Sequence, residues 1–372
     1  MRVPKILKVL YSPTKVFKEI AEKPSYTGVI LILVLFVASN ILVGYVTSTK
    51  YYFQKVKPNL FEGENDTWTE NATLWVSNSE PMENNDAVYG KNSISFTITN
   101  KSELYMQLKF PENINCTAQE FNQTSFSLKL VNSSVTPSNV SITLFSGETG
   151  YFVYYLNLKE KIKNWYVWNN ITVSLGEKET RWIGENASWG SINGIKFSVK
   201  FPKNVNATML LDALFFRGQY ESATKFFALI ASQYSIAYSM SFFMLWIIFG
   251  GLLYTLTKYA GSELKWKHNL IISGYSLAPL FIQELCIAGI FLFLPRINIA
   301  LGTVTVTSEI PGTLIFDLAA YSQFIFLAWA VVISTFAVRT LNNFTTGKSM
   351  VISLASYLMA FVFVRFFGLL GL

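Results

Sequence analysis

The chain has 372 residues, of which 51% are hydrophobic and 14% charged, against roughly 25% charged residues in an ordinary globular domain. This composition excludes a purely soluble protein. Two cysteines, Cys116 and Cys286, exclude a disulfide scaffold and a Cys-rich zinc site, and the single His268 leaves little material for histidine-based catalysis. The net charge of +7 is unevenly distributed. Residues 48–222 contain 16 Lys/Arg and 17 Asp/Glu, a net charge of −1, whereas the apolar remainder contains 14 Lys/Arg and 6 Asp/Glu, a net charge of +8. Positive flanks of membrane spans explain that excess without a nucleic-acid partner.

Residues 1–25 are predicted to form a cytosolic amphipathic helix. Ser12 followed by Pro13 is a good helix start. Val16, Phe17 and Ile20 then share one face opposite lysines and glutamates. This helix either lies on the inner leaflet, held by anionic lipid, or docks under the membrane helices.

Five apolar stretches are long enough to cross a bilayer, which needs about 20 helical residues. The first span occupies 26–47 and is too long, and too far from the start, for a cleaved signal peptide. Residues 223–372 hold the other four. The apolar stretches are Gly28–Val46, Tyr234–Thr257, Asn269–Leu294, Ala319–Arg339 and Met350–Leu370.

The charges in the short loops predict the orientation of these spans. If the chain crosses the membrane five times, the N-terminal segment, the loop between the second and third spans and the loop between the fourth and fifth spans lie on one side. Together they contain 11 basic and 3 acidic residues. That side is predicted to be cytosolic, which places residues 48–222 and the C-terminus outside. The basic residues are Arg2, Lys5, Lys8, Lys15, Lys18, Lys23, Lys258, Lys265, Lys267, Arg339 and Lys348.

Glycosylation sequons agree with this topology. Residues 48–222 contain ten N-x-S/T triplets, where roughly four are expected by chance. An outward, glycosylated segment in an archaeal plasma membrane or a eukaryotic endomembrane would explain the excess. Asn343 forms one more sequon, in a loop predicted to be cytosolic, and is expected to be unmodified. The ten asparagines are Asn65, Asn71, Asn100, Asn115, Asn122, Asn132, Asn139, Asn170, Asn186 and Asn206.

Residues 48–222 alternate apolar and polar positions in the manner of strands. The runs Ile94–Ile98, Leu104–Phe110, Phe126–Leu130 and Ile195–Phe201 each keep a period of two. Turn-forming segments separate them. The predicted fold is an all-β extracytoplasmic sandwich, inserted into an α-helical membrane bundle of five transmembrane helices.

The segment Trp189–Gly218 resembles the end of jelly-roll domains of the carbohydrate-binding-module and galactose-binding-like type. The resemblance lies in Trp189-Gly190-Ser191-Ile192-Asn193-Gly194-Ile195-Lys196-Phe197 and in Leu211-Asp212-Ala213-Leu214-Phe215-Phe216. It implies that Asp212 could hold a structural calcium; the alternative is an aspartate that caps a turn. No other cofactor is expected. Trp165 and Trp168 are candidates for an exposed aromatic pair that stacks on sugar rings, although core packing is the commoner fate of tryptophan.

The membrane segments resemble the Yip family, the Ypt/Rab-interacting membrane proteins, in its prokaryotic or archaeal form. Pro13, Phe17, Ile20 and Pro24 match the family's opening, and Gly274-Tyr275-Ser276-Leu277-Ala278-Pro279 matches its "glycine–tyrosine–x–x–x–proline" motif. The sandwich would then be an insertion after the first span. An "aspartate–leucine–tyrosine–glycine–proline" motif found in eukaryotic members is missing, which puts Rab binding in doubt. The resemblance implies a role in membrane organisation or vesicle traffic.

Two charges lie deep inside predicted spans. Glu284 and Arg365 are each 15 residues from the inner end of their span. A buried charge in a bilayer needs a partner, so these two side chains are predicted to pair. Pro279 is expected to bend the third span, and Gly274 with Ala278 to let helices approach closely.

No catalytic motif, phosphate-binding loop or dinucleotide fingerprint occurs, so an enzyme is not expected. The favoured hypothesis is a membrane-organising or trafficking-type scaffold whose outer sandwich binds a glycan or a cell-surface protein. The alternatives are a transporter or channel lined by Glu284 and the bent third span, and an anchored surface receptor. The bilayer is the one partner that the sequence makes certain; the oligomeric state stays open.

Overall fold

The computed structural model describes residues 5–59, 67–117, 120–300, 303–306 and 312–366. The chain divides into two compact units. The membrane unit comprises Met1–Phe53 and Ser222–Leu372, and the sandwich unit comprises Gln54–Glu221. The chain therefore leaves the membrane unit once and returns to it once.

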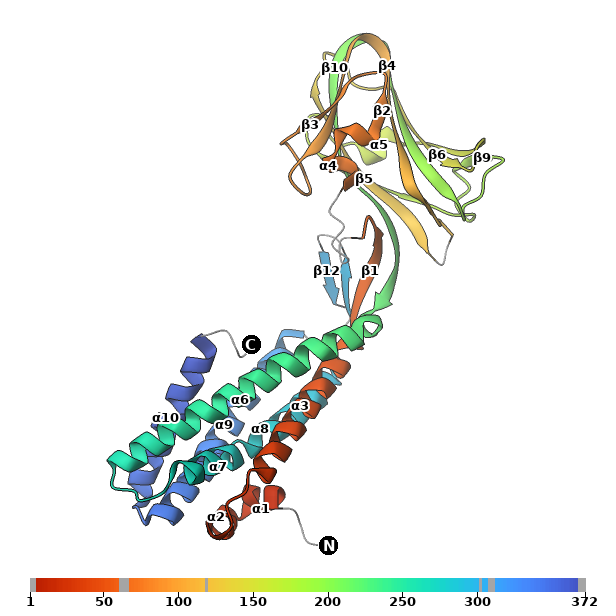
Figure 1. Ribbon diagram of the computed structural model, residues 1–372. Helices are drawn as coiled ribbons and strands as arrows, with labels where there is room; N and C mark the ends of the chain where they lie inside the picture. Colours follow the sequence, from red (N-terminus) through yellow and green to blue (C-terminus); the bar gives the residue numbers. More distant parts are fainter. Residues whose placement is uncertain (1–4, 60–66, 118–119, 301–302, 307–311, 367–372) are drawn as a thin grey trace. The chain divides into compact units, whose positions relative to one another are not determined.

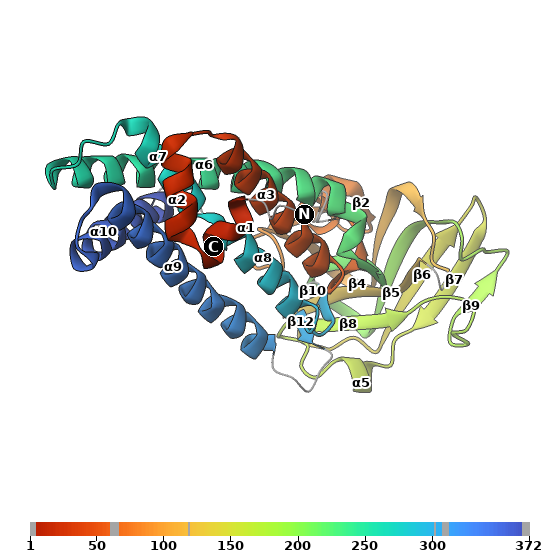
Figure 2. The ribbon, with the colours of Figure 1, turned by 90° about the horizontal axis from the view of Figure 1, so that it is seen from below.

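Among the described residues, five helical stretches are long and apolar enough to cross a membrane, as predicted. α3 packs against α6 and α8, α9 packs against α8 and α10, and α10 also packs against α6 (Figures 1 and 2). Buried side chains from all of these helices form one apolar cluster. The helices are α3 (Thr27–Ser48), α6 (Phe227–Tyr259), α7 (Trp266–Ser276) with α8 (Ala278–Phe291), α9 (Gly312–Asn342) and α10 (Thr346–Phe366).

The third span is broken where the sequence predicts a bend. α7 ends at Ser276 and α8 begins at Ala278, with Pro279 in its first turn. Proline has no backbone N–H to donate to the preceding turn of a helix, and its ring clashes with the carbonyl of that turn. It is well tolerated in the first turn of a helix, so one helix ends and a new one begins here. The backbone N–H of Leu277, between the two helices, donates to the carbonyl of Ser273 at 3.2 Å.

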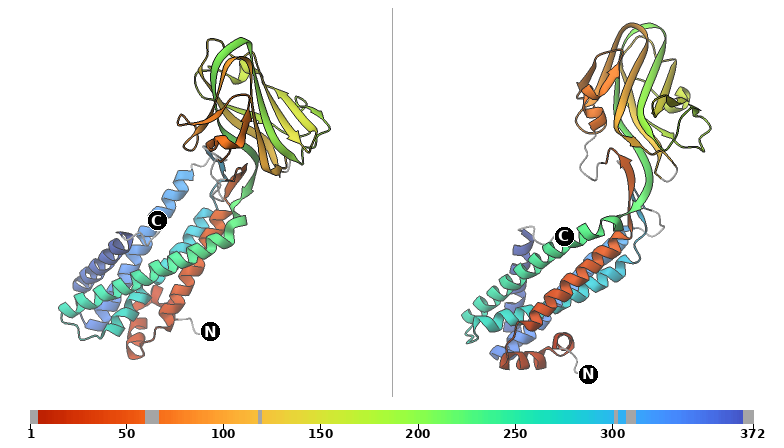
Figure 3. Two further views of the ribbon diagram at one scale, coloured as in Figure 1. Left: turned by 45° about the horizontal axis from the view of Figure 1, so that its top comes forward. Right: turned by 45° about the vertical axis from the view of Figure 1, so that its right-hand side comes forward.

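Two helices precede the first span. One helix was predicted within residues 1–25, whereas the described part of this segment forms two, α1 (Lys5–Tyr11) and α2 (Pro13–Glu22); α2 begins at Pro13, as predicted. Val16, Phe17 and Ile20 of α2 are at most 4% exposed and belong to the apolar cluster of the bundle. α2 packs against α9, at one end of the bundle (Figure 3). Of the two alternatives for this helix, the structure therefore supports docking under the bundle.

A short strand group and a single helical turn complete the membrane unit. β11 (Ile297–Ala300) and β12 (Thr303–Val306) form an antiparallel pair. β11 also runs parallel to Tyr51–Phe53 of β1 (Tyr51–Lys57). The turn η3 (Ala223–Phe226) leads into α6.

The sandwich unit is built on two long strands that each take part in two sheets. β4 (Ser93–Ile114) and β10 (Ile192–Ser222) pair antiparallel, with register shifts between Lys200 and Ala207. Before these shifts β10 also pairs with β6, and after them with β5. The remaining elements are α4 (Thr67–Glu70), η2 (Ala72–Leu74), β2 (Trp75–Ser77), β3 (Pro81–Asn84), β5 (Phe121–Asn132), β6 (Asn139–Ser146), β7 (Gly150–Tyr155), α5 (Leu158–Lys161), β8 (Asn169–Ser174) and β9 (Ile183–Glu185).

We call the two layers the front sheet and the back sheet. The front sheet has the order β2-β4-β10-β6-β7-β9 and uses residues 103–114 of β4 and 192–200 of β10. The back sheet has the order β3-β4-β10-β5-β8 and uses residues 93–98 and 207–218 of the same strands.

The core of this unit lies between the two sheets. The ring of Phe126 in the back sheet lies 4.7 Å from that of Phe197 in the front sheet, centroid to centroid. Trp75 and Phe96 meet in the same way at 5.7 Å. Because the alternating apolar residues of both layers form one buried cluster, the predicted β-sandwich is confirmed.

Candidate functional site

The outer face of the front sheet carries polar and aromatic side chains in register. Because side chains alternate across a strand, the buried positions of β4, β6, β7 and β10 face the core and the intervening ones face outward. The central row of outward residues runs across six strands: Ile183, Val153, Thr143, Lys196, Gln107 and Val76.

Four aromatic rings flank this row. Tyr151 lies opposite Phe145, Tyr155 lies opposite Ser141, and Tyr105 lies opposite Ser198. Tyr155 is 58% exposed, and Val76 and Ile183 at the edge strands are each 63% exposed. We call these residues the front face; it offers flat rings beside hydroxyl, amide and amine groups.

Two polar contacts hold rings of the front face in place. The ammonium of Lys196 lies 5.0 Å from the centroid of the Tyr105 ring, within the range of a cation–π contact. The hydroxyl of Tyr151 donates to the carboxylate of Glu185 at 2.5 Å, which raises the pKa of that phenol above its ordinary value. Both rings are therefore fixed before any ligand arrives.

Trp165 and Trp168, the predicted aromatic pair, lie outside the front sheet. Trp165 is half-buried and packs against the sandwich core. The indole N–H of Trp168 donates to Asp86 at 2.9 Å, and the Lys129 ammonium lies 5.9 Å from the Trp168 ring. Their part in sugar binding stays a prediction.

Asp212 is fully buried and its carboxylate accepts four hydrogen bonds. One oxygen accepts from the Thr69 hydroxyl (3.0 Å) and from the Ala213 backbone N–H (2.6 Å). The other accepts from the backbone N–H groups of Val88 (2.5 Å) and Tyr89 (3.0 Å). These donors suit a carboxylate that fastens a loop to the strand; a role of Asp212 as calcium ligand stays a prediction.

None of the nine sequon asparagines that the structure describes is buried. Asn122 and Asn139 are half-buried and the other seven are exposed, while Asn65 lies outside the described residues. Of the nine, Asn139 lies at the rim of the front face, opposite Lys200, and none lies in its central row. Asn343 of the membrane unit is exposed as well.

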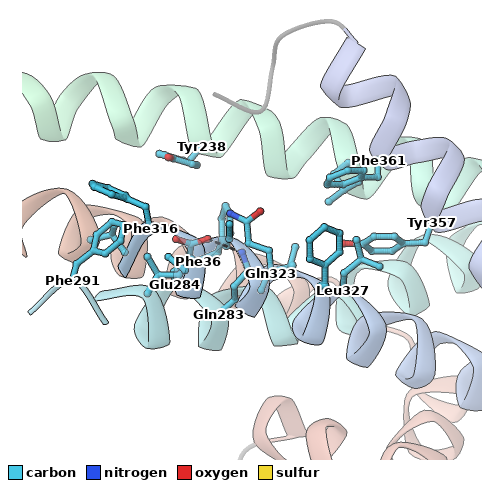
Figure 4. A pocket seen from close by; sticks show the side chains of 17 residues that line it. Phe36, Tyr238, Gln283, Glu284, Phe291, Phe316, Gln323, Leu327, Tyr357 and Phe361 are labelled. Carbon is cyan, nitrogen blue, oxygen red and sulfur yellow. Dashed lines mark hydrogen bonds between the residues drawn. The ribbon is translucent and has the colours of Figure 1, made fainter. Parts of the chain in front are cut away.

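The membrane unit contains a cavity of about 570 Å³ among α3, α6, α8, α9 and α10. Phenylalanines at its two ends, including Phe291, Phe316 and Phe361, make most of its wall apolar (Figure 4). In the middle Glu284 lies beside two amides; Gln283 donates to its carboxylate at 3.3 Å, and Gln323 faces it from α9. Such a cavity could hold an apolar molecule that carries one hydrogen-bonding group.

The predicted partner of Glu284 cannot be placed, because the Arg365 side chain lies outside the described residues. Glu284 itself is 9% exposed. The pairing of Glu284 with Arg365 therefore stays a prediction.

The glycine–tyrosine–proline motif lies where three helices meet. A Cβ added at Gly274 would overlap the Val29 side chain of α3 and lie 2.9 Å from Trp246 Nε1 of α6. The Trp246 indole donates to the Leu270 carbonyl at 2.6 Å, which ties α6 to α7. Gly274 therefore permits the close helix approach that the sequence predicts.

Sequence reasoning missed the front face and the two glutamines of the cavity. The signal was present in the polar positions of the strands, where Tyr105, Phe145, Tyr151 and Tyr155 interrupt runs of Ser, Thr and Lys. The sequence does not indicate which strands pair with one another. Only the pairing register of the strands, which the structure provides, shows that these four rings lie on one sheet.

Several solved structures are similar to part of this chain. A family 11 carbohydrate-binding module from Clostridium thermocellum, in complex with a β-1,3-1,4-mixed-linked tetrasaccharide, is 12% identical with a TM-score of 0.29, and the match covers 42% of this chain and 94% of the module. A β-1,2-glucanase from Parabacteroides distasonis is 15% identical with a TM-score of 0.29, over 41% of this chain and 25% of the enzyme. A module specific for non-crystalline cellulose is 11% identical with a TM-score of 0.25, over 38% of this chain and 80% of the module. Similarity at this level says nothing about activity.

No curated protein matches the chain. The family model of the Yip1 domain matches residues 201–367. The matched segment starts within β10, contains four of the five spans and includes Gly274, Tyr275 and Pro279. Residues 201–367 of this chain are similar to the Yip1 domain family.

Proposed function

We propose that this chain is a non-enzymatic, membrane-organising scaffold whose sandwich unit binds a glycan through the front face. The observation that carries the proposal is the register of the front sheet. It sets Tyr105, Phe145, Tyr151 and Tyr155 around a row of hydrogen-bonding side chains. Sugar rings have apolar faces that stack on aromatic rings and hydroxyls that need such partners.

Two further features support the front face over other surfaces of the sandwich. Its exposed apolar groups, Tyr155, Val76 and Ile183, extend from one edge strand to the other. The central row also contains none of the described sequon asparagines, and only Asn139 lies at its rim.

The test is binding of the full chain, reconstituted in nanodiscs, to an array of neutral and acidic glycans. Tyr155→Ala should weaken binding to the glycan selected by the array about tenfold, equivalent to about 1.4 kcal/mol. The matched control is Tyr166→Ala, because Tyr166 is 47% exposed but lies outside the front sheet. Failure of every glycan to bind, or equal losses in both variants, would contradict the proposal. Loss only in Trp165→Ala and Trp168→Ala would move the site to the tryptophan pair.

A further inference from the structure

A second cavity, of about 280 Å³, lies where the N-terminal helices meet the first span. We call it the N-terminal pocket. Lys23, Ser25 and Thr27 line it at the junction of α2 and α3, Tyr275 lines it from α7, and Ile6 and Leu31 add apolar wall. The glycan proposal uses none of these residues.

Tyr275 brings a hydroxyl to this pocket. Its side chain is 5% exposed and lines the pocket, and no hydrogen bond of this hydroxyl is found among the described residues. A Cβ added at Gly28 would overlap this hydroxyl, so it lies directly against the first turn of α3. The hydroxyl is therefore free to donate to an acceptor that enters the pocket.

The first turn of α3 presents a further donor to the same space. The N–H of Thr27 is used by the Ser25 hydroxyl at 3.2 Å, and that of Ile30 by the Tyr26 carbonyl at 2.9 Å. Gly28 lines the pocket, and no acceptor among the described residues takes its N–H. α3 has 22 residues, and the start of such a helix carries partial positive charge that attracts anions.

Lys23 adds a full positive charge at the mouth of the pocket. Its side chain is exposed, whereas Tyr275 lies at depth, so donors line the pocket from its opening inward. No acidic residue is among the described residues that line the pocket, whereas Lys23 and Tyr275 can donate to a ligand. The matching ligand is an anion with several acceptor oxygens.

We propose that the N-terminal pocket binds the phosphate group of an anionic membrane lipid. A phosphate oxygen would accept from the Tyr275 hydroxyl and others from the Gly28 N–H of α3 and the Lys23 ammonium. Ile6 and Leu31 would contact the glycerol and the first methylenes, and Leu31, 45% exposed, continues the apolar path along the first span. The volume exceeds what a bare phosphate fills but is smaller than most drug-sized sites, which span about 300–1,000 Å³. It therefore suits a headgroup fragment.

The test compares three probes on the detergent-purified full chain by native mass spectrometry: dioctanoyl phosphatidic acid, dioctanoylglycerol and inorganic phosphate. Phosphatidic acid should be retained and dioctanoylglycerol should not. Tyr275→Phe removes only the hydroxyl and Lys23→Gln only the charge, and each should weaken phosphatidic acid binding about tenfold. Matched controls are Tyr357→Phe, another buried tyrosine of the bundle, and Lys18→Gln, an exposed lysine within α2; neither residue lines the pocket.

Each outcome decides the proposal. Retention of inorganic phosphate as tight as that of phosphatidic acid, with the same loss in Tyr275→Phe, would support the phosphate site and identify a soluble anion as its ligand. Equal retention of both lipids, or unchanged binding in Tyr275→Phe and Lys23→Gln, would overturn it. Because the front face plays no part in this assay, its result is independent of glycan binding.

Discussion

Single buried groups hold distant parts of the sandwich together, and Asp212 is the clearest case. Its carboxylate joins three segments, namely α4 through Thr69, the loop at Val88 and Tyr89, and the strand β10 at Ala213. Ala213 has a φ of 52°, a left-handed conformation that is uncommon for a residue other than glycine. The hydrogen bond from its N–H to Asp212 helps to keep it there.

We predict that Asp212→Ala destabilises the sandwich by about 3 kcal/mol, because it leaves buried N–H groups without an acceptor. Chemical denaturation of the full chain in detergent, followed by tryptophan fluorescence, measures the change. Glu148→Ala, in the exposed turn between β6 and β7, is the control and should change stability by less than about 0.5 kcal/mol. If calcium raised the stability of the wild type and Asp212→Ala abolished the effect, the aspartate would be a metal ligand instead.

Asp86 makes the sandwich sensitive to acid. The Lys129 ammonium donates to one of its oxygens at 2.6 Å and the Trp168 indole to the other at 2.9 Å, and both bonds hold the pKa of Asp86 below its ordinary value. Because the folded state favours the ionised form, the stabilisation is present above the unfolded pKa of about 3.9 and is lost as the pH falls through the lower folded pKa.

We therefore predict that Asp86→Asn lowers stability at pH 6 by less than about 1 kcal/mol, since the Asp86 side chain is 45% exposed. The difference from the wild type should shrink below about pH 4. Denaturation curves between pH 2.5 and 7 measure it. A difference that stays constant across this range would show that the carboxylate charge has no part in the effect.

The sequence could identify these residues as unusual but not their partners. Trp168 lies 82 positions from Asp86, and Asp212 lies 143 from Thr69. The sequence suggests Trp168 as a candidate for stacking on sugar rings. In the structure its indole N–H donates to the carboxylate of Asp86. Such pairs depend on strand order, which period-two alternation does not encode.

At the scale of elements, close helix packing depends on small residues at the crossing points. Gly274 lies where α7 meets α3 and α6, and a Cβ there would overlap the Val29 side chain. Gly289 of α8, in the same span, has open space around the position of a Cβ. The two glycines therefore form a matched pair.

We predict that Gly274→Ala destabilises the membrane unit by about 1–3 kcal/mol through overpacking. Gly289→Ala should be neutral or stabilise it by up to about 1 kcal/mol, since alanine favours the helix. Thermal unfolding in detergent, with helix content followed by circular dichroism, compares them. Equal effects of the two changes would show that α7 does not approach α3 as closely as the structure has it.

Hydropathy predicts the long helices well because each must satisfy its backbone within itself in a bilayer. It fails for elements whose stability comes from neighbours, such as α1 and the pair β11–β12, which have 7, 4 and 4 residues. Alternation also splits β4 into two expected strands, Ile94–Ile98 and Leu104–Phe110. The structure makes them one strand that changes sheets near Asn100, whose φ is 52°.

At the scale of the whole molecule, the sandwich has a core of its own. Its buried apolar cluster contains side chains of the sandwich unit alone. We predict that residues 54–221 expressed alone give a strand-rich circular dichroism spectrum and melt cooperatively. A spectrum typical of a disordered chain would show that the sandwich needs the membrane unit in order to fold.

The topology of the chain decides which surfaces a glycan and a lipid phosphate can reach. Basic residues are concentrated in the N-terminal segment and in the loops before α7 and α10, which favours a cytosolic position for these parts. This orientation stays a prediction; it would place the sandwich on the opposite side, where N-linked glycans are attached.

We predict that most of the ten sequons between Asn65 and Asn206 carry glycan when the chain is expressed in its native host, and that Asn343 does not. Exposure cannot be the reason for the difference, because Asn343 is as accessible as Asn71 or Asn170; only the side of the membrane separates them. Mass spectrometry of proteolytic peptides, before and after enzymatic deglycosylation, measures the occupancy of each site. Glycan on Asn343 together with bare sequons in the sandwich would reverse the orientation, placing the front face in the cytosol and the N-terminal pocket at the outer leaflet.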